Sequence, residues 1–136
     1  MRARLVAIAF GGLVAGLAAI VIAAPPQQGG NPEAAKLKNP VAANAESLAT
    51  GETLFRRRCA GCHGVDAKGG PPKDAGDPAA ANLIDDKWDH GGSDGEIYTV
   101  IREGIGPDYR MEGFADRLSE AETWHVINYL RSLAKK

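Results

Sequence analysis

The chain has few cysteines, few aromatic residues and no strand-like segment. Its 136 residues include two Cys and two Met, and aromatic residues make up only 6% of a chain that is 44% hydrophobic. Two cysteines cannot build a framework of several disulfides. No segment shows the apolar–polar alternation of a half-buried strand. One small domain with so few large side chains has a thin core, which a large apolar cofactor would complete.

Charge of neither sign dominates the sequence. There are 16 Lys and Arg residues against 17 Asp and Glu residues, so the formal net charge is −1. One basic run occurs, Arg56-Arg57-Arg58, and no platform of aromatic residues accompanies it. A nearly neutral chain without such a platform is not expected to bind nucleic acid.

A single long hydrophobic run lies at the N-terminus. Residues 5–24 are uncharged, and Arg2 and Arg4 precede them, which is the pattern of an export signal. A run of ~20 residues exceeds the ~7–15 of a cleavable signal and can span a bilayer. Residues 1–24 are therefore a cleaved signal peptide or a retained membrane anchor. Either way, the remainder is expected in the periplasm or at the outer face of the cytoplasmic membrane.

The composition changes after this run. Residues 25–43 contain four prolines together with Gly and Gln and few apolar side chains, which predicts a flexible linker. A folded domain is expected over residues 44–136, and Asn44 is a candidate N-cap for its first helix.

The run Cys59-Ala60-Gly61-Cys62-His63 is the motif that carries chemistry. On one helical turn, positions i and i+3 project from the same face, so both thiols can reach the two vinyl groups of one porphyrin. His63 follows immediately, where a ring nitrogen can bind the iron as proximal ligand. The spacing predicts one covalently bound haem c per chain.

Two other uses of a CxxC motif fit less well. A tetrahedral zinc site needs a fourth ligand, and no second CxxC or HxxxH cluster supplies it. A thioredoxin-like dithiol follows a buried strand in a βαβ unit, whereas these cysteines follow a helical pattern and precede a Gly/Pro-rich loop.

Three longer helices are expected around the motif. Leu48, Gly51 and Phe55 share one face of a helix that leads into Cys59. Capping boxes at Ser93–Glu96 and Ser119–Glu122 open two further helices. Gly104 would cap the end of the first of these, and the second carries an apolar stripe of Val126, Tyr129, Leu130 and Leu133. Residues 64–92, rich in Gly, Pro and Asp, are expected to form a long loop with a short helix over 79–81.

Residues 44–136 resemble class I cytochromes c. That family has a Gly and an aromatic residue before the haem cysteines, and an aromatic residue on a C-terminal helix that packs against them. The resemblance implies an all-α cytochrome c fold, with three to five helices around one covalently attached haem. The positions that carry the resemblance are Gly51, Phe55, Cys59, Cys62, His63 and Tyr129.

The resemblance also implies the remaining ligands. The family places a methionine before the last helix as distal axial ligand, and Met111 occupies that place, although Arg110 precedes it where many relatives have a small residue or Pro. A thioether ligand favours ferrous iron. The rival ligands are His90, interpreted as a solvated loop residue, and His125, interpreted as a helix residue that faces solvent or caps a core contact.

Other residues are expected around the haem. In the family a proline carbonyl accepts the hydrogen of the proximal imidazole, and either Pro71 or Pro72 could supply it. Asn82, Trp88 and Tyr98 could line the haem pocket, with the two aromatic residues interpreted primarily as core.

The function expected from these features is electron transfer rather than catalysis. A mono-haem cytochrome would carry single electrons between exported or membrane redox partners, such as a dehydrogenase and an oxidase or reductase complex. Arg56-Arg57-Arg58 either steers an acidic partner or is a solvated helix face. The alternative is a haem enzyme or gas-binding protein, in which Met111 does not bind the iron and the distal site is open.

Overall fold

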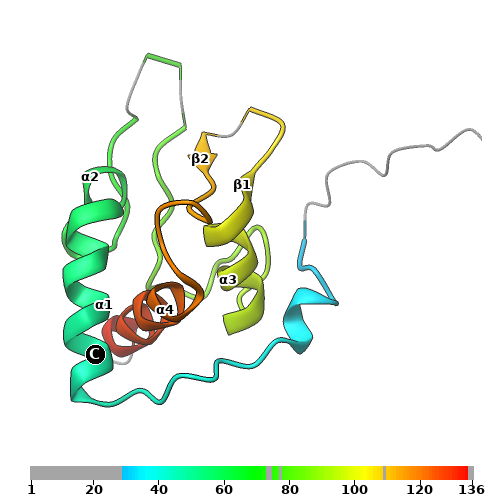
Figure 1. The fold of residues 1–136 in the computed structure, drawn as a ribbon. Coiled ribbons are helices and arrows are strands. Elements are labelled where there is room, and N and C mark those ends of the chain that lie inside the picture. Colours follow the sequence, from blue (N-terminus) through cyan, green and yellow to red (C-terminus); the bar gives the residue numbers. More distant parts are fainter. Residues whose placement is uncertain (1–28, 73–74, 77, 109, 135–136) are drawn as a thin grey trace, which may run out of the picture.

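The computed structural model describes residues 29–134 except 73, 74, 77 and 109. Helices dominate this part of the chain, which confirms the all-α fold class (Figure 1). The expected signal or anchor, residues 1–24, lies outside the described residues. Within the described ranges, every helix is too short or too polar to cross a bilayer. The elements in order are η1 (Ala34–Lys36), α1 (Ala45–Arg58), α2 (Ala60–His63), α3 (Asp94–Glu103), β1 (Gly104–Ile105), β2 (Met111–Glu112) and α4 (Glu120–Ala134).

The core is built where α1 crosses α4. Gly51 permits the crossing, because an ideal Cβ at this position would lie 2.0 Å from the backbone oxygen of His125. One turn later, the buried ring of Phe55 packs against Tyr129 with ring centroids 5.6 Å apart. Ile127 is also fully buried at this level. The predicted face of α1 and the apolar stripe of α4 therefore meet each other.

The predicted helix caps are present. The side chain of Asn44 accepts a hydrogen bond from the backbone N–H of Ser47 (2.9 Å). Ser93 and Glu96 form a complete capping box at the start of α3. The box before α4 has the same bonds, since the Glu122 carboxylate accepts from both the backbone N–H and the hydroxyl of Ser119 (2.8 Å each). Side chains near each start satisfy amide groups that the helix leaves free.

A short hairpin follows α3 and was not expected from the sequence. Strands β1 and β2 pair antiparallel, with Ile105 opposite Met111. The hairpin lies close against the end of α3, because Gly104 caps that helix with a φ of 79°. A Cβ at Gly104 would lie 2.5 Å from the Met111 carbonyl oxygen. Strands of two residues are too short to produce a visible alternation pattern.

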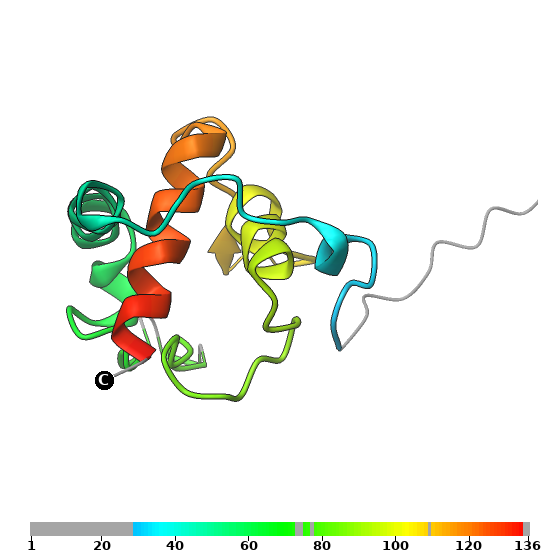
Figure 2. The ribbon, with the colours of Figure 1, turned by 90° about the horizontal axis from the view of Figure 1, so that it is seen from below.

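Residues 29–43 differ from the flexible linker that was expected. This segment, called the strap below, runs from the start of α1 across α4 to α3 (Figure 2). Ala34 is buried, and the amide of Asn39 donates to the Asn128 side chain (2.9 Å). Asn128 in turn donates to the Val41 carbonyl (3.1 Å). The composition that predicted a flexible linker gives no sign of these side-chain bonds.

The expected helix over residues 79–81 is absent from the structure. Ala80 instead forms an isolated antiparallel bridge with Gly70. Extended backbone is favoured here because two glycines at 69 and 70 allow another segment to lie directly against theirs.

Candidate functional site

The two cysteines lie where α1 ends and the short helix α2 follows it. The backbone N–H of Cys59 still donates to the Phe55 carbonyl (2.8 Å), so α1 positions the first thiol directly. Cys59 is half-buried and Cys62 is exposed. Burial raises the pKa of the Cys59 thiol to about 11, and the nearby Cys62 adds to the rise. Partial burial of Cys59 therefore disfavours the charged thiolate, and Cys59 and Cys62 lie one helical turn apart.

The ring of His63 is oriented by one backbone carbonyl. Its Nδ1 lies 3.0 Å from the carbonyl oxygen of Ala81. Since a carbonyl only accepts, Nδ1 carries the hydrogen and donates it, which leaves the lone pair on Nε2. This is the tautomer that a metal-ligating imidazole adopts when a second group holds its other nitrogen.

Ala81 takes the role that the sequence assigned to a proline. Pro71 and Pro72 are exposed, and the ring of His63 donates its hydrogen bond to the carbonyl of Ala81 instead. The expectation of a proline carbonyl at this position is therefore wrong for this chain. A backbone acceptor has no residue signature. The only signal in the sequence was the Gly69-Gly70 pair, whose small size lets the segment around Ala81 lie close to α2.

Met111 lies in β2, which is at the same end of the domain as α2 in Figure 1, with loop segments between the two elements. It is half-buried. The hairpin that carries it is fixed to α3 and to the chain that follows, because the Phe114 N–H donates to the Ile101 carbonyl (2.9 Å). The chain thus carries an imidazole and a thioether on two separately anchored elements.

Neither rival histidine lies in the α2 region. The Nδ1 of His125 is 2.8 Å from the Ser47 hydroxyl, and Asn128 donates to the same hydroxyl (2.9 Å). His125 therefore makes a contact at the helix crossing, as one of its two expected roles required. His90 lines an open pocket between the strap and α3.

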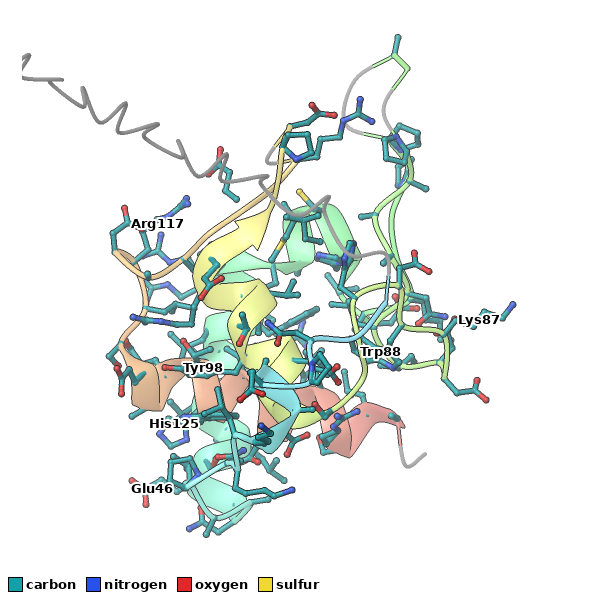
Figure 3. The ribbon with its side chains drawn as sticks, turned by 90° about the vertical axis from the view of Figure 1, so that its right-hand side faces the viewer. Glu46, Lys87, Trp88, Tyr98, Arg117 and His125 are labelled. Carbon is teal, nitrogen blue, oxygen red and sulfur yellow. The ribbon has the colours of Figure 1, made fainter. Side chains whose placement is uncertain are left out.

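The aromatic candidates occupy two different settings. Tyr98 stacks on Trp124, with centroids 4.2 Å apart and planes 14° apart, so it belongs to the core. Trp88 is half-buried on the loop side, opposite His125, and neighbouring Lys87 points away from the domain (Figure 3). The indole of Trp88 donates to the Asp85 carbonyl (3.1 Å). The side chain of Asn82 accepts from the Ile84 N–H (3.0 Å), so it shapes the loop.

The residues present fit a covalently bound haem. Cys59 and Cys62 are spaced for the two vinyl groups, the imidazole of His63 has a free Nε2 for the iron, and the thioether of Met111 is a candidate for the second axial position. Several apolar side chains are only half-buried at the edge of the core and offer an apolar surface for a porphyrin. They are Ala60, Leu83, Ile84, Trp88 and Phe114.

Comparisons with known proteins agree with this site. Residues 46–130 match the family described as cytochrome c oxidase, cbb3-type, subunit III. The cbb3-type oxidase subunit CcoP of Rhodobacter capsulatus is 38% identical over 94 residues, which are 65% of this chain and 30% of that protein. The subunit FixP of Azorhizobium caulinodans is 39% identical over 92 residues, 63% of this chain and 29% of that protein. The chain thus spans about a third of the length of these relatives.

Solved structures show the same fold. Cytochrome cL from Methylophaga aminisulfidivorans superposes with a TM-score of 0.55 and 26% identity, over 71% of this chain and 59% of that one. A chain of a Kuenenia stuttgartiensis reducing HAO-like complex superposes with a TM-score of 0.58 and 22% identity, over 73% of this chain and 48% of that one. Together with the matched residues, these similarities show that the chain belongs to the cbb3-type cytochrome c oxidase subunit III family, a family of c-type cytochromes with covalently bound haem c.

Proposed function

We propose that this chain is a mono-haem electron-transfer protein and not itself an enzyme. In this proposal Cys59 and Cys62 form the thioether bonds to haem c, His63 is the proximal ligand and Met111 is the distal ligand. The domain spans residues 44–136, with the strap packed against it. When bound, the haem supplies reversible one-electron chemistry at its iron.

One observation supports this assignment more than any other. The Nδ1 of His63 donates to the Ala81 carbonyl, so Nε2 is free to bind the iron, and His63 directly follows Cys62 in the sequence. A haem enzyme needs an acid–base group over an open iron face. His90, the loop histidine, lines the pocket between the strap and α3 instead.

The residues of the chain also explain why electron transfer would be rapid. Both proposed axial ligands are fixed by backbone bonds, His63 through Ala81 and the Met111 hairpin through its contacts with α3. If both axial ligands keep their positions in the ferric and ferrous states, few atoms move during electron transfer. A thioether as distal ligand stabilises the ferrous state relative to a second histidine.

The α2 end is the proposed place of electron exchange with redox partners. Gly61 and Cys62 are exposed there, and Val65 is the most exposed large apolar side chain of the described residues, at 66%. Arg57 and Arg58 are exposed on the last turn of α1 directly before this end. An apolar centre beside basic side chains suits brief contact with an acidic redox protein.

The relatives suggest the setting of this contact. They are subunits of cbb3-type cytochrome c oxidases, which gives a membrane oxidase complex as a candidate partner. The export pattern of residues 1–24 is consistent with a position in the periplasm or at the outer face of the cytoplasmic membrane.

The coordination can be tested by the absorption spectrum of the purified, reduced haem protein with and without carbon monoxide. We expect no change for the native protein, because both axial positions are occupied. In Met111→Ala we expect a shifted spectrum with carbon monoxide and a lower reduction potential, because a soft ligand to ferrous iron is lost. A native protein that binds carbon monoxide at once would support the enzyme or gas-binding alternative.

The docking end can be tested by reversing its charge. The double variant Arg57→Glu with Arg58→Glu should reduce ferricyanide, an anionic acceptor, about tenfold more slowly at low salt, since steering of this kind changes rates by 10–10³. Lys36→Glu with Lys38→Glu changes the net charge equally on the strap and is the control. Stopped-flow traces at several salt concentrations give the rates. Equal slowing by both variants would contradict docking at α2.

A further inference from the structure

The carbonyl that orients His63 is delivered by a small backbone assembly. The Ala80 N–H donates to the Gly70 carbonyl (3.1 Å), and the Leu83 N–H donates to the Ala67 carbonyl (2.8 Å). These bonds lay the segment 80–83 antiparallel on the loop 67–70. The loop is itself bonded to α2, because the Gly69 N–H donates to the His63 carbonyl (2.9 Å). Apart from its bond to the His63 ring, the position of Ala81 therefore depends on the loop.

This assembly has no space for side chains at two positions. An ideal Cβ on Gly70 would lie 2.2 Å from the carbonyl oxygen of Cys62. One on Gly69 would lie 2.5 Å from the carbonyl oxygen of Ala80. Both contacts are with backbone atoms, which cannot turn aside as the end of a flexible side chain can. A side chain at either position must push the loop from α2 or the segment 80–83 from the loop.

The two glycines differ in one respect that matters for an experiment. Gly69 has a φ of 93°, which any L-residue adopts only with strain. Gly70 has no such φ, so its backbone accepts alanine and only the contact with Cys62 opposes the methyl group. A substitution at Gly70 therefore tests the spacing between α2 and the loop without a change in backbone preference.

We propose that Gly70 is a positioning residue for the axial ligand: by letting the loop lie on Cys62, it sets the hydrogen bond from His63 to Ala81 and thereby the reduction potential. This inference rests on the proposed function. A hydrogen bond from the far nitrogen makes the imidazole a stronger electron donor, which stabilises ferric iron. Lengthening the bond weakens that donation, so the reduction potential rises.

The test compares two substitutions in the exported, haem-loaded full chain. Gly70→Ala moves the loop, whereas Ala79→Ser adds one uncharged atom at an exposed position directly before Ala80. Spectroelectrochemical titration gives the potential, and NMR gives the shift of the His63 ring N–H. We expect Gly70→Ala to raise the potential and move the ring resonance upfield, and Ala79→Ser to leave both unchanged.

A second variant covers the case in which Gly70→Ala does not fold. Ala80→Pro removes the N–H that donates to Gly70 without adding bulk against α2, and it should shift the potential in the same direction. If a folded variant keeps the potential and ring resonance of Ala79→Ser, Gly70 has no positioning role. If native protein carries no haem or has a ligand other than His63, which its spectrum reports, the proposed function itself fails.

Discussion

The α1–α4 crossing and the described residues of the loop between 64 and 83 (all but 73, 74 and 77) hold their shapes by different means. At the crossing, large side chains such as Phe55 and Tyr129 pack on each other and exclude water. In the loop the backbone does this work, through bonds such as Ala80 to Gly70 and through glycines that touch other carbonyls. The shape of the crossing depends on large packed side chains, and the shape of the loop depends on glycines whose missing side chains allow close backbone contact.

The difference matters because the two regions serve the same site. The crossing fixes the end of α1 and so the place of Cys59, while the loop fixes the ring of His63. Side-chain packing contributes most of the stability. A backbone assembly contributes little burial, but it holds one acceptor at a defined distance. Most of the folding stability and the orientation of the His63 ring thus depend on different regions of the chain.

Deleting a side chain at the crossing should have the largest effect on stability. Phe55→Ala removes a fully buried ring, and we expect the free energy of unfolding to fall by about 4 kcal/mol. Val65→Ala, at an exposed loop position, should change it by less than about 0.5 kcal/mol. Guanidinium denaturation followed by circular dichroism measures both. A loss below about 1 kcal/mol in Phe55→Ala would show that side chains do not dominate the crossing.

Acid should weaken the crossing through the cap of α4. Hydrogen bonds from the backbone N–H and the hydroxyl of Ser119 lower the pKa of Glu122 below its ordinary value. Its contribution to stability is therefore complete above about pH 4.3, the value for an unfolded chain, and is lost as the pH falls through the lower folded value.

The variant Glu122→Gln isolates this effect, because glutamine can still complete a capping box but does not titrate. We expect its stability to fall less between pH 5 and pH 3 than that of the native protein, by under about 1 kcal/mol for a partly exposed group. Glu120→Gln removes a charge from the same turn and is the control. Urea denaturation at each pH gives the comparison, and identical pH profiles for Glu122→Gln and the native protein would rule out this role.

The smallest effect is expected where the backbone controls the loop. Ala67 is fully buried with a φ of 59°, a conformation that costs an L-residue about 1 kcal/mol and glycine almost nothing. Ala67→Gly should therefore change the free energy of unfolding by less than about 0.5 kcal/mol, because this relief offsets the lost methyl group. Ala34→Gly, at a buried strap position without positive φ, should cost about 1 kcal/mol. Thermal melts measure both changes. Equal losses of stability in Ala67→Gly and Ala34→Gly would show that the positive φ of Ala67 carries no strain.

The same comparison explains what could be predicted from the sequence. Gly51, Phe55 and Tyr129 are recognisable because helical spacing places them on facing surfaces, and the capping boxes are recognisable because their side chains make the bonds. Cys59, Cys62 and His63 were identified from their order in the motif, and their assignment as haem ligands, with that of Met111, stays a proposal.

The loop and the strap were harder to predict for a physical reason. The acceptor for His63 is a main-chain oxygen, which every residue has, so Ala81 carried no signal and a proline was expected instead. The strap reads as a linker because few of its side chains are apolar, yet Asn39 and Val41 bind Asn128, 87 to 89 residues away. Long-range polar bonds of this kind have no periodicity that a sequence can display.

The packed strap also sets the reach of the domain. Its first described residue, Gly29, donates to the carbonyl of Asp89, and the hydrophobic run of the N-terminus ends at Ala24. Only residues 25–28 separate the two, so Ala24 and Gly29 lie at most about 18 Å apart. In a protein that retains this run in the membrane, the cytochrome domain therefore cannot move far from the bilayer to reach its partners. It stays at the lipid surface, and its partners have to come there.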